Sequence, residues 1–205
     1  MDIVNTGKKL HQALNVTNVA EGLAPLLIRL YLAPVLIQAG WNKANSFDSV
    51  VQWFGNSEWG LGMPFPELMA FLAIAAELVG GVLILVGLAT RWASIPLMIT
   101  MVVAAVTVHW QNGWPAIADA SSWLADGTIL HNEQVMQAQE KLAMAKDILQ
   151  EYGNYDWLTS SGNFVILNNG IEFAATYFIM LLSLFFTGGG RFTSVDYYLC
   201  RWLCR

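Results

Sequence analysis

Charged residues are scarce in this chain. Lys, Arg, Asp and Glu make up 12% of its 205 residues, about half the share found in soluble globular domains. Basic residues are fewer than acidic ones: the chain has ten Lys and Arg and fifteen Asp and Glu, which gives a formal net charge of −5. This balance argues against a nucleic-acid binder, which needs a surplus of Lys and Arg to neutralise phosphates. The overall deficit of charge argues against an ordinary cytosolic enzyme.

Motifs for autonomous chemistry are also missing. The sequence has no P-loop, dinucleotide fingerprint, GxSxG elbow or HExxH zinc motif. It shows no haem pair, flavin fingerprint or cysteine cluster. Autonomous catalysis is therefore not expected.

Hydrophobic residues are abundant, at 56% of the chain, and they are grouped. Four largely apolar blocks cover residues 23–41, 68–88, 92–110 and 171–187. A bilayer crossing takes about 20 apolar residues. The blocks predict an all-α integral membrane protein, a four-helix bundle that forms one domain over 1–205. Small residues of the second block, including Gly80 and Gly81, are typical of close helix packing.

The basic residues also predict an orientation. Lys8, Lys9, Arg91, Arg191, Arg201 and Arg205 lie on one side of the four spans, and Lys43, Lys141 and Lys146 lie on the other. Basic loops favour the cytoplasmic side, so both termini are expected there. The polar segment Met1–Gly22 does not resemble a cleavable signal peptide. The connection 111–170 is then an outer loop.

This outer loop contains a predicted amphipathic helix. Its apolar residues recur at spacings of three and four: Val135, Ala138, Leu142, Ala145, Leu149 and Tyr152. Asn132 is the expected N-cap and Gly153 the stop. The apolar stripe packs on the protein itself, lies in the membrane surface or receives a protein partner, and the pattern leaves these alternatives open.

Two ionisable residues lie well inside the predicted spans. Arg29 is in the first span and Glu77 in the second, where each costs about 2.5 to 3.5 kcal/mol unless it is paired or useful. Antiparallel spans place them at depths that differ by about 7 to 8 Å, so an Arg29–Glu77 pair is available. Either the pair only fixes helix register, or Glu77 is a ligand-binding or proton-relay carboxylate controlled by Arg29.

A second polar group is expected at the outer ends of the spans. Gln38 and Lys43 are near the end of the first block, His109 is near the end of the third, and Glu172 opens the fourth. His109 and Glu172 suit a polar head group or a metal, although one His with one Glu is not a firm metal signature. The alternative is an ordinary interfacial histidine.

The cysteines, Cys200 and Cys204, are four residues apart and do not form a CxxC pair. A reducing inner side argues against a structural disulfide. The sequence leaves three alternatives for these two residues: free thiols, acylated thiols, or thiols that take part in metal capture by a partner.

Short motifs in order along the chain resemble the DoxX family. They are Leu27-Ile28-Arg29-Leu30, Gln38-Ala39-Gly40-Trp41-Asn42-Lys43, Glu77-Leu78-Val79-Gly80-Gly81, Gly87-Leu88-Ala89-Thr90-Arg91, His109 and the closing Gly188–Asp196 stretch. The resemblance implies a bacterial inner-membrane four-helix bundle, similar to the DoxD subunit of thiosulfate:quinone oxidoreductase. By position, the family's polar set corresponds to Arg29, Lys43, Glu77, Arg91 and His109.

Two functions follow from the resemblance and the polar residues together. In the first, the bundle binds a quinone near Glu77, Arg29 and His109 and supports a membrane oxidoreductase. In the second, it is a non-catalytic membrane partner in oxidative-stress resistance or in maturation of a small copper-binding peptide, and the outer loop binds the partner protein. Transport of a small solute is a weaker third possibility, because four short helices leave little room for a path.

Overall fold

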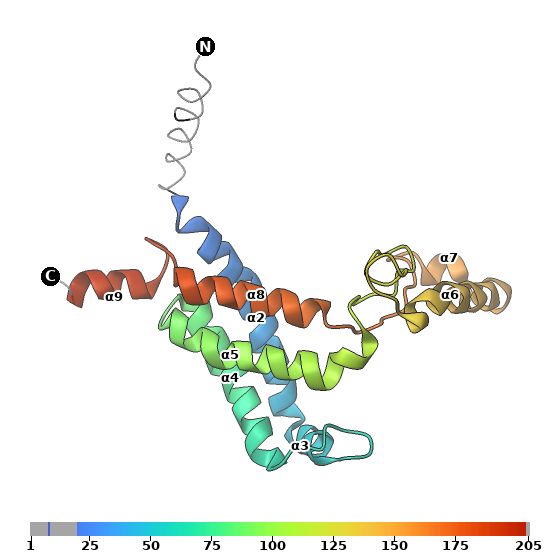
Figure 1. The fold of residues 1–205 in the computed structure, drawn as a ribbon, viewed down its shortest axis with the longest axis horizontal. Helices are drawn as coiled ribbons and strands as arrows, with labels where there is room; N and C mark the ends of the chain where they lie inside the picture. Colours follow the sequence, from blue (N-terminus) through green and yellow to red (C-terminus); the bar gives the residue numbers. More distant parts are fainter. Residues whose placement is uncertain (1–7, 9–19, 204–205) are drawn as a thin grey trace. The chain divides into compact units, whose positions relative to one another are not determined.

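The protein is helical throughout the part that can be described. A computed structural model describes Lys8 and residues 20–203, and among these residues there are two isolated β-bridges but no strand. The residues Lys9, His11, Cys204 and Arg205, and most of Met1–Gly22, lie outside them. Figure 1 shows the course of the helices. The chain divides into two compact units, the first formed by Met1–Thr100 with Tyr177–Arg205 and the second by Met101–Thr176. The single domain over 1–205 stays a prediction.

Three helical segments in the described residues are long and apolar enough to cross a membrane. They are Leu23–Asn45, Pro66–Val86 and Thr90–Asn112, and a shorter apolar helix covers Glu172–Thr187. The three longer segments confirm the predicted blocks at 23–41, 68–88 and 92–110 to within a few residues. The chain is therefore a multi-pass membrane protein, whereas the fourth crossing and the orientation remain predictions.

Helix α2 (Leu23–Asn45) packs against helix α4 (Pro66–Val86) in the first unit. Glycines permit this contact. A Cβ on Gly40 would lie 2.9 Å from Leu78 Cγ, and a Cβ on Gly81 would lie 2.8 Å from Ile37 Cγ1. Larger side chains at these positions would separate the helices. The predicted close-packing role of Gly81 is thus confirmed.

Helix α5 (Thr90–Ala104) continues through a π-helical turn, η2 (Ala105–His109), and a 3₁₀ turn, η3 (Trp110–Asn112). It packs on α4 through Leu97, which a Cβ on Gly80 would approach to 3.1 Å. Helix α8 (Glu172–Thr187) is the shorter apolar helix. The most buried apolar side chains of the first unit are Leu32, Ala33, Leu36, Ala70, Ile84, Leu97, Leu181 and Leu184.

Four helix ends meet at one end of the first unit. Arg191, just after α8, forms an ion pair with Glu21, just before α2, at 3.0 Å. Asp196 accepts hydrogen bonds from the backbone N–H groups of Ala89 and Thr90, at the start of α5. We call this region the Arg29 end: the start of α2, the end of α4, the start of α5 and the end of α8. Helix α9 (Val195–Leu203) follows directly.

The second unit contains the predicted amphipathic helix, α6 (Glu133–Tyr152). Asn132 caps it by accepting a hydrogen bond from Val135 N at 3.2 Å, and it ends at Gly153, as expected. Val135 and Ala138 are buried, but Tyr152 is 79% exposed. The apolar stripe is therefore covered near its start and open near its end. A short helix, α7 (Tyr155–Leu158), contacts α6.

The sequence patterns missed helix α3 (Phe47–Gly55) and helix α9. Helix α3 packs against α4 and buries Phe54. A Cβ on Gly55 would lie 2.9 Å from Pro66 Cγ, so this helix closely approaches the start of α4.

Candidate functional site

The site is centred on an ion pair between two membrane-spanning helices. Lys43 Nζ lies 2.6 Å from both carboxylate oxygens of Glu77. The Glu77 side chain is only 7% exposed, whereas Lys43 is 29% exposed. Glu77 lies in the middle of α4, and Lys43 is in the last turn of α2. This pair places a buried carboxylate in contact with an ammonium group that remains partly accessible.

The backbone explains how Lys43 reaches Glu77. A Cβ on Gly40 would lie 3.0 Å from Glu77 Cβ, so Gly40 is level with the carboxylate. Lys43 is one turn further along α2, and helical side chains lean towards the N-terminus of their helix. The lysine therefore extends back over the space that Gly40 leaves open. Its long apolar stem can cross one turn of the helix.

Arg29 has a different environment. Its Nε donates to Ile84 O at 2.8 Å and its Nη2 to Leu85 O at 2.7 Å. Its Nη1 donates to Gly189 O at 2.6 Å and to Thr193 O at 3.0 Å. The side chain is buried, and its donors bind carbonyl groups at the end of α4 and in the turn after α8. Arg29 thus joins three parts of the first unit.

Arg29 and Glu77, whose depths leave a pair available, bind other partners. The antiparallel register places Arg29 opposite Ile84 and Leu85, about two turns beyond Glu77 along α4. The last carbonyls of a helix lack intrahelical partners, so they are strong acceptors for a buried guanidinium. Glu77 is instead neutralised by Lys43.

The polar residues of the second unit have local partners. His109 Nδ1 lies 2.8 Å from Asn169 O, which also accepts from Asn112 Nδ2 at 3.1 Å. Glu172 Oε2 accepts from Ala116 N at 2.8 Å. A joint role of His109 and Glu172 at a head group stays a prediction. Over residues 20–203 and Lys8, no group of three or more His, Cys, Asp or Glu is arranged to hold a metal.

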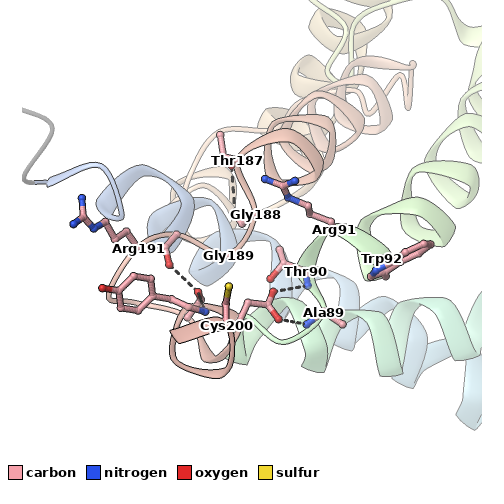
Figure 2. Close-up of a pocket in the computed structure, with 13 residues that line it drawn as sticks. Ala89, Thr90, Arg91, Trp92, Thr187, Gly188, Gly189, Arg191 and Cys200 are labelled. Carbon is pink, nitrogen blue, oxygen red and sulfur yellow. Dashed lines mark hydrogen bonds between the residues drawn. The ribbon is translucent and has the colours of Figure 1, made fainter. Parts of the chain in front are cut away.

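The remaining candidates are placed as follows. Gln38 is exposed on α2 in the first unit, and Arg91 donates to Phe186 O at 3.0 Å at the Arg29 end. The residue patterns alone did not identify Asp196, whose Oδ1 and Oδ2 accept from Ala89 N at 2.6 Å and Thr90 N at 2.9 Å (dashed lines in Figure 2). An acidic residue far along the sequence gives no local signal that it caps this helix.

Comparison with known proteins covers the segment that holds the ion pair. The family model described as DoxX matches residues 24–110. A Bacillus subtilis (strain 168) protein named "Putative oxidoreductase CatD" is 33% identical over 86 residues, which are 42% of this chain and 60% of that protein. The match thus spans less than two thirds of the relative's length, and no solved structure matches the chain. Over residues 24–110, this membrane protein is therefore similar to the DoxX family.

Proposed function

We propose that this protein is a membrane subunit that binds a quinone and supports an oxidoreductase complex. The observation that carries the proposal is the Lys43–Glu77 pair, a buried carboxylate within a membrane-spanning helix and in contact with a partly exposed ammonium. An intramembrane ionisable pair of this kind is a functional-site hypothesis by default. The relative named as an oxidoreductase matches the same segment.

The chemistry of the pair suits a quinone site. A bound quinone would supply electron transfer coupled to proton uptake. Glu77 and Lys43 both carry groups that can hold or release a proton within hydrogen-bond reach of a head group. Lys43 is close enough to the end of α2 to connect the buried carboxylate with the interface. Arg29, whose donors bind carbonyls, would hold the helices around the site, and Gln38 remains a proposed ligand residue of this unit. His109 and Glu172 remain proposed ligand residues within the second unit.

The test is the quinone content of protein purified from native membranes in mild detergent. Wild-type protein should retain quinone close to one per chain, and Glu77→Gln should lose most of it. The matched control is Glu67→Gln, an exposed carboxylate in the first turn of the same helix. Wild-type quinone content and undiminished quinone-linked electron transfer in Glu77→Gln would refute the proposal.

The first unit also supports a fourth crossing. Three spans would leave the chain on the side opposite to its start, yet the end of α8 meets the start of α2 through Arg191 and Glu21. Crossing by α8 would return the chain to this side. We therefore propose a four-helix bundle in the bacterial inner membrane. The distribution of basic residues supports an orientation with both termini in the cytoplasm.

A second candidate function is that of a non-catalytic membrane partner, in oxidative-stress resistance or peptide maturation. It is favoured by the open apolar face of α6, where Met144 is 61%, Ile148 is 59% and Tyr152 is 79% exposed. Deleting residues 133–151 should then abolish co-purification of the partner. The control Glu140→Gln, an exposed change in the same helix, should preserve it, and unchanged co-purification after the deletion would remove this candidate.

A further inference from the structure

A cavity of about 460 Å³ lies at the Arg29 end of the first unit. Figure 2 shows that it is formed by the start of α5, the glycine-rich turn after α8 and helix α9. Its polar lining includes Arg91, Arg191, Ser194 and Asp196. The Lys43–Glu77 pair does not belong to this lining.

The charges around the cavity favour an anion. Arg91 and Arg191 are exposed and lie on opposite sides of the Gly188–Gly189 segment in Figure 2. Arg91 donates to Phe186 O and Arg191 donates to Glu21 Oε1, each at 3.0 Å. Arg191 also interacts with Tyr197, and its Cζ lies 4.8 Å from the centre of the Phe192 ring. A guanidinium has five N–H donors, so both retain donors for a ligand.

The nearby carboxylates do not cancel this preference. Both oxygens of Asp196 already accept backbone N–H groups at the start of α5. Glu21 is in contact with Arg191, and the buried Arg29 lies next to the α4–α5 turn, where its Cζ would be 2.7 Å from a Cβ on Gly87. The cavity lining itself therefore holds two guanidinium groups, of Arg91 and Arg191, and one carboxylate, of Asp196.

The position of the cavity corresponds to the membrane interface. Trp92, in the first turn of α5, is 76% exposed, and Trp202, on α9, is 73% exposed. Tryptophan is enriched where hydrocarbon meets the polar head groups. Helix α9 is too short to cross a bilayer, and its apolar side chains Tyr198, Leu199 and Leu203 are exposed. A lipid at this level would have its head group beside the arginines and its chains beside apolar surface.

We propose that this cavity binds the phosphate ester of an anionic phospholipid. Arginine suits this ligand because its planar donors match phosphate oxygens and because it is weakly hydrated compared with an ammonium. Anionic lipid is chosen over zwitterionic lipid because the cavity carries a surplus of positive charge. The proposal does not depend on quinone binding at Glu77.

The test is native mass spectrometry of the full-length protein in detergent, titrated with phosphatidylglycerol or phosphatidylcholine. Wild type should bind one phosphatidylglycerol in preference to phosphatidylcholine. Arg91→Gln and Arg191→Gln should each weaken binding about fivefold, and together about thirtyfold. The matched control is Arg201→Gln, which removes an exposed arginine from α9 outside the cavity lining and should have little effect.

Two further measurements distinguish loss of charge from misfolding, and a lipid from a free phosphate. The variant with both Arg91→Lys and Arg191→Lys retains the charge, so it should bind more phosphatidylglycerol than the glutamine pair if charge, and not misfolding, is responsible. Inorganic phosphate is titrated in parallel to distinguish a lipid from a free phosphate. Equal binding of the two lipids, wild-type binding by the double glutamine variant, or arginine-dependent binding of inorganic phosphate without phosphatidylglycerol would each overturn the lipid assignment.

Discussion

Arg29 and Lys43 are two cations of one membrane-spanning helix, and their partners are of different kinds. Arg29 donates to four backbone carbonyls, whereas Lys43 contacts a single carboxylate. Arginine can satisfy several acceptors at once because its donors are fixed in a plane. A lysine has a compact charge on a flexible stem, so it follows its partner and remains partly in contact with water.

Replacing Arg29 with Met should be strongly destabilising. The change removes the guanidinium donor from four carbonyls. Ile84 O still accepts from Gly87 N at 3.1 Å, whereas the carbonyls of Leu85 and Thr193 lose their donor. An unsatisfied buried acceptor costs about 1 to 3 kcal/mol, so we expect a loss of about 2 to 6 kcal/mol. Unfolding in detergent measures the loss. Arg201→Met is the exposed control, and an equal effect of the two changes would contradict the assigned role.

The Lys43–Glu77 pair should respond asymmetrically to mutation. Lys43→Gln leaves a carboxylate that is 7% exposed without a cation and should cost about 3 kcal/mol. Glu77→Gln leaves a lysine that can extend to the interface, so its cost should be about 1 kcal/mol or less. The double variant should recover most of the stability lost in Lys43→Gln. Equal costs for the two single variants would show that the pair is not buried as described.

The sequence identified the charged residues of the membrane-spanning helices as candidates, but it did not predict their contacts. Arg29, Lys43 and Glu77 are conspicuous because charge is rare in apolar helices. The partners of Arg29 are backbone carbonyls, which every residue carries, so no side-chain pattern identifies them. Lys43 was assigned to the outer end by its position in the chain, whereas its Nζ reaches a carboxylate one turn deeper.

Helix α6 is the element that the sequence described most completely. An N-cap, a regular apolar spacing and a glycine stop all agree over Glu133–Tyr152. Helices α3 and α9 carried no comparable signal, because each is nine residues long and offers little more than two turns of periodicity. Long apolar blocks likewise predicted the spans well, since bilayer thickness sets their length.

The cap of α6 gives a prediction for this element. Asn132 accepts from Val135 N and donates to Asn112 O at 2.9 Å, so it both starts the helix and attaches it to η3 within the second unit. Asn132→Ala should destabilise the first turn by about 1 to 2 kcal/mol. Hydrogen exchange at the start of α6 should rise. Gln134→Ala, at a neighbouring exposed position, is the control, and similar exchange in both variants would argue against the cap.

The four-crossing topology is a prediction for the whole molecule. With Cys200 and Cys204 replaced by Ser, single cysteines at Glu21 and Tyr198 should react with an impermeant maleimide only from the cytoplasmic side. Cysteines at Glu67 and Ser121 should react from the outside. The reason is that Glu21 and the end of α8 lie together, whereas Glu67 opens α4 at the opposite end from Arg29.

The labelling pattern distinguishes the possible topologies. Glu21→Cys and Tyr198→Cys on opposite sides would indicate three crossings and an α8 that does not span. Labelling of all four cysteines from the opposite sides would indicate a four-helix bundle with the inverted orientation. Glu21 forms an exposed ion pair, so its replacement should have little effect on folding.

The bonds of Arg29 also bear on how the protein is made. Its last two acceptors, Gly189 and Thr193, follow it by 160 and 164 positions in the chain. During synthesis, the arginine therefore enters the bilayer long before half of its partners exist. A nascent chain that ends before Gly189 retains an incompletely solvated cation in lipid. The C-terminal turn thus completes the assembly, because it supplies the last two acceptors of this buried guanidinium.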